Sequence, residues 1–194
     1  MKHADDYSGW GNELLYKMCT ERPKHNDIDT IVAKIWIIGR SYSAAIERKA
    51  GNGFKIEKAA KFLIDSDIDD HVSRLRAIER VNDLNIGTLL SAHKHVTDVL
   101  AKATGIEKRS LASKYLHFHS PSSVFIYDSI ASSRIREALR TKRKRFEIPN
   151  GYDDAYASFA YRCMYYRDHH LEPKIGKYAS PRRLDMELLG YGNL

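Results

Sequence analysis

Apolar residues recur along this chain at spacings of three and four, which is the period of an amphipathic α-helix. In the segment 28–38, for example, the apolar positions 28, 31, 32, 35 and 38 share one helical face. The alternation of apolar and polar residues that marks a β-strand is nearly absent. The pattern therefore predicts an all-α protein, with helices near 9–20, 28–38, 56–64, 68–82, 86–103, 109–118, 129–140, 152–169 and 181–189.

Glycine and proline predict where several of these helices end or begin. Pro23 follows the first helix, Gly105 is a good stop for the fifth, and Pro181 begins the last. Gly39 falls inside the second helical pattern, and we expect a break there, with the helix resuming over 42–48. The segments 46–55 and 141–151 are predicted loops. No internal repeat divides the chain, so residues 1–194 are expected to form one domain with two closely packed lobes.

The composition is that of a soluble globular protein, with 43% hydrophobic and 29% charged residues. Cys19 and Cys163 both lie in apolar and aromatic surroundings, which predicts buried, reduced thiols rather than a disulfide or a metal site. No apolar run approaches the length of a membrane span, and no signal peptide opens the chain. We expect a cytoplasmic protein without membrane contact.

The net charge of +7 is unevenly distributed. Residues 1–100 carry 15 basic and 15 acidic side chains, whereas residues 101–194 carry 17 and 10. A one-sided basic surface attracts phosphates, so DNA or a nucleotide is the expected partner, and no particular protein partner is indicated. The alternative is a solvated helix end followed by a basic loop. The excess is concentrated in Arg134, Arg136, Arg140, Lys142, Arg143, Lys144 and Arg145.

The most informative stretch runs from Gly105 to Ser129. It predicts a glycine turn between two helices, a proline-containing loop, and an aspartate, Asp128, at the start of a third helix. The turn exposes backbone N–H groups beside the positive end of the following helix, which suits a phosphate. Further donors for that phosphate would come from Lys108, Arg109 and Ser110.

This order of elements resembles the hairpin and catalytic loop of the helix-hairpin-helix DNA glycosylases. The residues of 109–118 and 127–129 resemble more closely still the small bacterial proteins of the 8-oxoguanine DNA glycosylase-like fold. The segments 34–48 and 181–189 resemble the same group of proteins. The resemblance implies a two-lobed all-helical fold, with the hairpin at about 99–118 and the catalytic loop at about 119–129.

The resemblance also implies a chemistry. Asp128 would take the position of the catalytic aspartate and stabilise positive charge at C1′, or deprotonate a nucleophile, with the target base flipped into a pocket. In the alternative, Asp128 has only a structural role as a helix cap. The implied activity is an N-glycosylase for a modified purine in DNA, in DNA repair or antiphage defence. A non-catalytic module that binds nucleic acid or nucleotides, and a subunit that binds an acidic protein, are the alternatives.

The bifunctional glycosylases of this superfamily use a lysine for Schiff-base chemistry, and this sequence departs from their pattern at that lysine. Its position falls at about Arg109 or Ser110 here, and Glu107 stands near the place of the second hairpin glycine. Lys114 lies one helical turn after Ser110 on the same face, so it could reach the same pocket. It could also pair structurally with Asp128 or face solvent. We therefore expect no strong lyase activity.

Other residues qualify as candidates for the pocket. Arg40 and Tyr42 follow Gly39 and could contact a phosphate and stack on a base, or Arg40 could pair with Glu47. The loop supplies three more candidates, His117, Tyr127 and Ser129. Among the nine histidines, the pairs 93/95 and 117/119 are two residues apart and face opposite sides of a helix, unlike zinc ligands. We expect neither a metal nor a cofactor.

Overall fold

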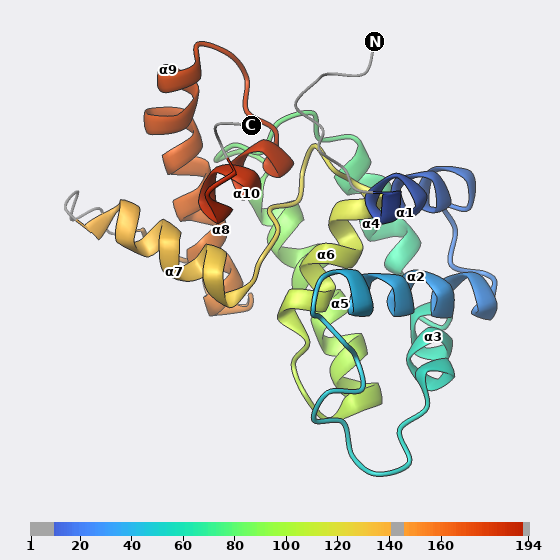
Figure 1. Ribbon diagram of the computed structural model, residues 1–194. Coiled ribbons are helices and arrows are strands. Elements are labelled where there is room, and N and C mark those ends of the chain that lie inside the picture. Colours follow the sequence, from blue (N-terminus) through green and yellow to red (C-terminus); the bar gives the residue numbers. More distant parts are fainter. Residues whose placement is uncertain (1–9, 141–145, 192–194) are drawn as a thin grey trace.

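The computed structural model describes residues 10–140 and 146–191, and within these ranges the chain is helical without any strand. Figure 1 shows the helices in two neighbouring groups, α1 to α6 and α7 to α10. The all-α prediction is confirmed. The elements are α1 (Trp10–Glu21), α2 (Ile28–Ser41), α3 (Ile56–Ile64), α4 (Ile68–Arg76), α5 (Ile86–Thr104), α6 (Arg109–His119), α7 (Ser129–Ala138), α8 (Asp154–Tyr166), a π-helical turn (Arg167–Leu171), α9 (Glu172–Ile175) and α10 (Pro181–Leu189).

Helix α5 is the central element of the first group. It packs against α3, α4 and α6, while α2 covers α3 and α6 and contacts α1. In the second group α7 packs between α8 and α10. Contacts between α5 and α8 join the two groups, and the segment 120–128 runs from α6 to α7 across the junction (Figure 1). The residues on either side of this segment are therefore brought to the boundary between the groups.

Local sequence explains where several helices start and stop. Asp27, Asp128, Asp153 and Ser180 each precede a helix, and each side chain accepts a hydrogen bond from a backbone N–H in the first turn. Gly105 closes α5 in the left-handed region, with φ of 72°, as its position predicts. Helix α6 then starts at Arg109 and packs against α5, so the predicted hairpin of two helices around a glycine turn is confirmed.

The predicted break at Gly39 is wrong. Helix α2 continues through Gly39 to Ser41, and the residues 42–48 form turns rather than a resumed helix. A Cβ atom at position 39 would lie 3.2 Å from the backbone of Ala45, so the glycine allows the chain to fold back against the end of α2. The glycine at position 39 is therefore explained by a close backbone contact and not by a helix end.

Two further boundaries differ from the prediction. Helix α4 ends at Arg76, before the expected end at 82, and the helix expected over 152–169 changes to a π-helical turn at Arg167. The Arg167 side chain is fully buried, and its guanidinium donates to the carbonyl of Val81 and pairs with Asp168. Within α8, Tyr156, Phe159 and Cys163 are buried, whereas Tyr152, which precedes the helix, is only partly buried.

Both cysteines are free and buried, as predicted. Burial raises the pKa of the Cys19 thiol to about 11, against the lowering effect of nearby Lys34 and Arg76. Burial also raises the pKa of the Cys163 thiol. A thiol with a raised pKa is a poor nucleophile at neutral pH. Of the helices in the described ranges, none combines the length and the apolar character that crossing a bilayer would require.

Candidate active site

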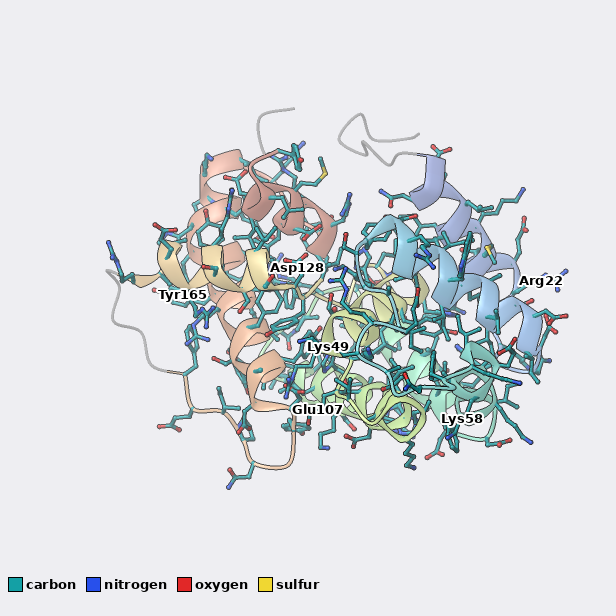
Figure 2. The ribbon with its side chains drawn as sticks, turned by 60° about the horizontal axis from the view of Figure 1, so that its bottom comes forward. Arg22, Lys49, Lys58, Glu107, Asp128 and Tyr165 are labelled. Carbon is teal, nitrogen blue, oxygen red and sulfur yellow. The ribbon has the colours of Figure 1, made fainter. Side chains whose placement is uncertain are left out.

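Asp128 lies at the junction between the two helix groups, as the last residue before α7 (Figure 2). Its Oδ1 atom accepts a 2.8 Å hydrogen bond from the backbone N–H of Ala131, which makes it the N-cap of α7. The other oxygen, Oδ2, lies 3.5 Å from the ammonium nitrogen of Lys114. The side chain is 26% exposed, so the carboxylate has a role in the fold and is also open to a ligand.

Lys114 approaches Asp128 from the middle of α6. Its side chain is 4% exposed. Its Nζ donates to Ser110 Oγ at 2.9 Å and to the carbonyl of Tyr42 at 3.4 Å. Burial lowers the pKa of Lys114, and the charges of Asp128 and Asp185 oppose that shift. Lys114 and Ser110 lie on the same face of α6, as their spacing predicts, and they are joined by a direct hydrogen bond.

A second carboxylate, Asp185 on α10, belongs to the same cluster of charges. Arg182 contacts its Oδ2 at 2.7 Å, while its buried Oδ1 has no hydrogen-bond partner within the described part of the chain. Burial raises the pKa of Asp185 to about 6; Arg182 and Lys114 act against this rise, and Asp128 adds to it. Because α10 packs against α7, whose N-cap Asp128 contacts Lys114 of α6, the three helices bring these charges together.

Asp185 and Arg182 were not among the residues selected from the sequence. A signal was present, because Asp185 stands between Leu184 and Met186 on a helix whose neighbouring residues are buried. An acidic residue that is 4% exposed needs a partner or a changed pKa. An acidic residue at a buried helix position is therefore a candidate for function. Helix periodicity alone does not distinguish such a residue from a charged residue on the surface.

Three side chains fix the backbone of the loop that carries Asp128. Ser113 Oγ accepts from the N–H of Tyr127 at 3.0 Å, directly before Asp128. The ring Nδ1 of His117 donates to the carbonyl of Val124 at 2.9 Å, and the hydroxyl of Tyr156 donates to the carbonyl of Phe125 at 3.0 Å. The loop is thus tied to α6 on one side and to α8 on the other.

The predicted pocket residues of this loop lie in different environments. His117 is fully buried, with its Nε2 2.8 Å from the hydroxyl of Tyr16, so it supports the loop from within the core. The Tyr127 ring packs edge-on against Phe159, 5.2 Å between centroids, and the residue also lines a surface pocket. Ser129 is exposed at the start of α7.

A pocket of about 330 Å³ opens beside this cluster, between the hairpin turn and the segment that follows α2. Its lining includes Ser110 and Tyr127, which also belong to the surroundings of Lys114 and Asp128. This volume lies at the small end of the range for ligand pockets, roughly 300 to 1,000 Å³. The other lining residues are Ser43, Ala44, Ala45, Arg48, Lys49, Ile106, Glu107, Lys108, Arg109 and Leu111.

The residues predicted to bind phosphate are only partly gathered at this pocket. Gly105 is exposed in the turn, and Lys108, Arg109 and Ser110 line the pocket. Arg109 also forms ion pairs with Glu107 and Asp153. Arg134 is exposed on α7, and a Cβ atom added at Gly190 would lie 3.2 Å from one of its guanidinium nitrogens. Lys142 and Arg143 lie outside the described residues.

The two candidates after Gly39 have structural contacts. Arg40 is exposed and pairs with Glu47 at 3.0 Å, which is the alternative that the sequence left open. Tyr42 packs its ring against Phe118, 5.4 Å between centroids, and burial raises the pKa of its phenol to about 12. Its carbonyl accepts from Lys114, so Tyr42 helps to enclose the ammonium group.

The described residues offer no obvious metal centre, since no group of three or more His, Cys, Asp or Glu side chains among them is arranged to hold an ion. His93 stacks on Tyr156, with ring centroids 3.5 Å apart, and His95 stacks on His71 at 4.4 Å. The two histidines therefore face different neighbours, as their spacing in the sequence indicates.

Comparison with known families gives one match. The model of the HI_0787_N family, which is described as an N-terminal domain, matches residues 1–123. The chain belongs to this family. The matched region holds Tyr42, the hairpin and Lys114, and it ends before Asp128 and α10. Neither the search of curated proteins nor that of solved structures gave a significant match.

Proposed function

We propose that this member of the HI_0787_N family is an N-glycosylase that releases a flipped or modified purine from DNA. The observation that carries the proposal is the contact between the buried Lys114 ammonium and the Asp128 carboxylate, 3.5 Å apart beside a pocket. Oxidised purines such as 8-oxoguanine and modified purines of foreign DNA are the proposed substrates. The proposed setting is the cytoplasm, in DNA repair or antiphage defence.

Asp128 is the proposed catalytic residue. Its Oδ1 is held by the α7 cap, and its Oδ2 remains for the substrate. As the bond between C1′ and the base breaks, the bonding electrons leave with the base and positive charge develops on the sugar, where a carboxylate stabilises it. Water then attacks C1′, and its proton passes to Asp128 and from there to the departing base, which gives a neutral free base and an abasic sugar.

Lys114 is proposed to act through its charge rather than as a nucleophile. A Schiff base requires a neutral amine that is free to reach C1′. Here the ammonium contacts three oxygen atoms, from Ser110, Tyr42 and Asp128. Burial lowers its pKa, but the adjacent carboxylates favour the charged form. This arrangement supports hydrolysis without strong lyase activity.

The same contacts also favour a second candidate, a non-catalytic module that binds nucleic acid. An ammonium group has three N–H donors, and each has an oxygen within reach in this site. A buried lysine that is satisfied in this way can serve as a purely structural link between α6 and the loop before α7. In this case the pocket and its basic residues would hold phosphates without any bond being cleaved.

A strand-cleavage assay separates the two functions. The substrates are oligonucleotides that carry 8-oxoguanine, other damaged bases or modified purines, and each reaction is read with and without hot alkali. We expect alkali-dependent cleavage by the wild type and its loss in Asp128→Asn, with binding retained. Cleavage without alkali that is lost in Lys114→Ala would instead reveal lyase chemistry.

Asp27→Asn is the matched control, because Asp27 caps α2 as Asp128 caps α7 but lies away from the site. It should leave cleavage unchanged. If the wild type cleaves none of the substrates yet binds them, and Asp128→Asn binds equally well, the glycosylase proposal is wrong and the binding module is favoured. Because asparagine also caps helices well, a general loss of the fold does not explain a loss of cleavage in Asp128→Asn.

A further inference from the structure

The pocket beside Lys114 and Asp128 is built from two segments far apart in the sequence. One wall is the turn after α2, with Ser43, Arg48 and Lys49, and the other is the hairpin turn from Ile106 to Leu111. Lys108 joins the walls, since its Nζ donates to the carbonyl of Arg48 at 2.5 Å. The segment after α2 therefore forms part of the same surface as the hairpin.

The charges around this pocket favour an anion. Four cationic residues line it, Arg48, Lys49, Lys108 and Arg109, against the single carboxylate of Glu107, which pairs with Arg109. Arg48 and Lys49 are exposed, and no side-chain ion pair or hydrogen bond joins either of them to another described residue. Burial lowers the pKa of Lys108, and the charge of Glu47 opposes this shift. The charges of Arg48 and Lys49 lower the pKa of Lys108 further. This mutual repulsion would be relieved by a bound anion.

The backbone of the segment after α2 is held in an unusual conformation at the same place. Ser43 and Lys49 have φ angles of 52° and 61°, in the left-handed region that residues other than glycine seldom adopt. Hydrogen bonds from Ala44 N to the carbonyl of Gly39 (3.1 Å) and from Arg48 N to that of Ala45 (3.3 Å) maintain the turns. Backbone strain of this kind is concentrated at ligand sites, and here it sets the position of the Lys49 side chain at the pocket.

We propose that Arg48 and Lys49, together with Lys108, form a subsite for a backbone phosphate of the nucleic-acid strand whose target nucleotide lies at Lys114 and Asp128. In its reference to a target nucleotide the inference rests on the proposed function, but the phosphate contact does not require cleavage. Phosphate contacts set the register of a strand without reading its sequence. The subsite thus gives the segment after α2 a role in presenting the sugar to Asp128.

Lys58 provides a matched control for Lys49. Lys49 lies near the junction with Glu107, whereas Lys58 of α3 lies towards the far end of the first helix group (Figure 2). Both lysines are exposed, so Lys58→Ala removes one surface charge without touching the pocket. Glycine is the chosen replacement at position 49, because it removes the charge and still permits the positive φ. Lys49→Arg restores the charge.

The test is fluorescence anisotropy with a labelled duplex and a labelled single strand, each carrying a stable abasic-site analogue, over a series of KCl concentrations. Each lost phosphate contact lowers the slope of log affinity against log salt by about 1. We expect this decrease in Arg48→Ala and Lys49→Gly and recovery in Lys49→Arg. The slope of Lys58→Ala should equal that of the wild type.

An unchanged slope in both pocket variants, or an equal decrease in Lys58→Ala, would overturn the subsite. Competition by inorganic phosphate and by a nucleoside monophosphate tests the source of the phosphate. If the monophosphate matches the oligonucleotide in affinity and loses it in Lys49→Gly, the assignment to a strand is overturned in favour of a free nucleotide. Because anisotropy measures no cleavage, a protein that binds as expected but excises nothing contradicts only the proposed glycosylase.

Discussion

Lys114 Nζ lies 3.5 Å from Asp128 Oδ2, although one residue is in the middle of α6 and the other caps α7. The loop between them is fixed by side chains on both flanks, so the two charges meet at a defined place between the helix groups. An aspartate that caps a helix and also faces a buried lysine links the stability of the fold to the chemistry of the site.

Replacing Asp128 with alanine should cost more stability than the same change at Asp27. Both substitutions remove a helix cap, and at Asp128 the loss of the cap costs about 1 kcal/mol. Asp128→Ala also leaves the Lys114 ammonium with only neutral oxygens, at a further cost of about 1 to 3 kcal/mol. Urea unfolding of the two variants measures the difference, and equal losses would show that Lys114 gains nothing from Asp128.

Asp185→Asn should stabilise the protein at neutral pH. The pKa of Asp185 is raised from 3.8 to about 6, so the folded protein binds a proton more tightly than the unfolded chain does. The stability that comes from this proton is fully present below pH 3.8 and is lost as the pH rises through 6. Since asparagine is always neutral, the variant should exceed the wild type by roughly 1 to 3 kcal/mol at pH 7.5.

This advantage should shrink towards zero as the pH falls to 4. Thermal unfolding of both proteins across this range provides the measurement. A pH-independent difference would show that Asp185 does not carry the raised pKa. Arg182→Gln is the control for the lost ion pair, because Arg182 lowers the pKa of Asp185 and its removal should increase the pH dependence.

Ser113→Ala should loosen the loop that presents Asp128. The serine hydroxyl is the acceptor for the N–H of Tyr127, and leaving a partly buried donor unsatisfied costs about 1 to 3 kcal/mol. If the glycosylase proposal holds, turnover should fall while oligonucleotide binding stays close to that of the wild type. Ser133→Ala on the exposed side of α7 should change neither quantity, and a similar loss there would argue against a positioning role for Ser113.

The protein should lose stability in mild acid through its buried histidines. Burial lowers the pKa of His93 and of His117 to about 4, so the folded protein keeps both neutral while the unfolded chain takes up protons below about 6.5. The stability that they contribute is present above pH 6.5 and falls as the pH drops towards 4. His117→Gln should flatten this dependence in thermal unfolding, whereas His169→Gln, at an exposed position, should not.

Much of the fold could be predicted from the sequence because its helices are set by local interactions. The bounds of α3 and α10 agree with the apolar spacing, and Gly105 ends α5 through its left-handed φ. The segment after Gly39 could not be predicted in this way. There the helical pattern continues in the sequence, but contact between Gly39 and Ala45 turns the chain back.

The sequence by itself determined the helical class, the hairpin and the position of Asp128 as a cap, because helix periodicity, glycine turns and capping act over a few residues. Only the tertiary structure decided that Lys114 contacts Asp128, that Asp185 joins their charges, and that Arg48 and Lys49 line a pocket with the hairpin. These relationships depend on how α2, α6, α7 and α10 pack, and the spacing of residues within one helix carries no information about which other helix lies against it.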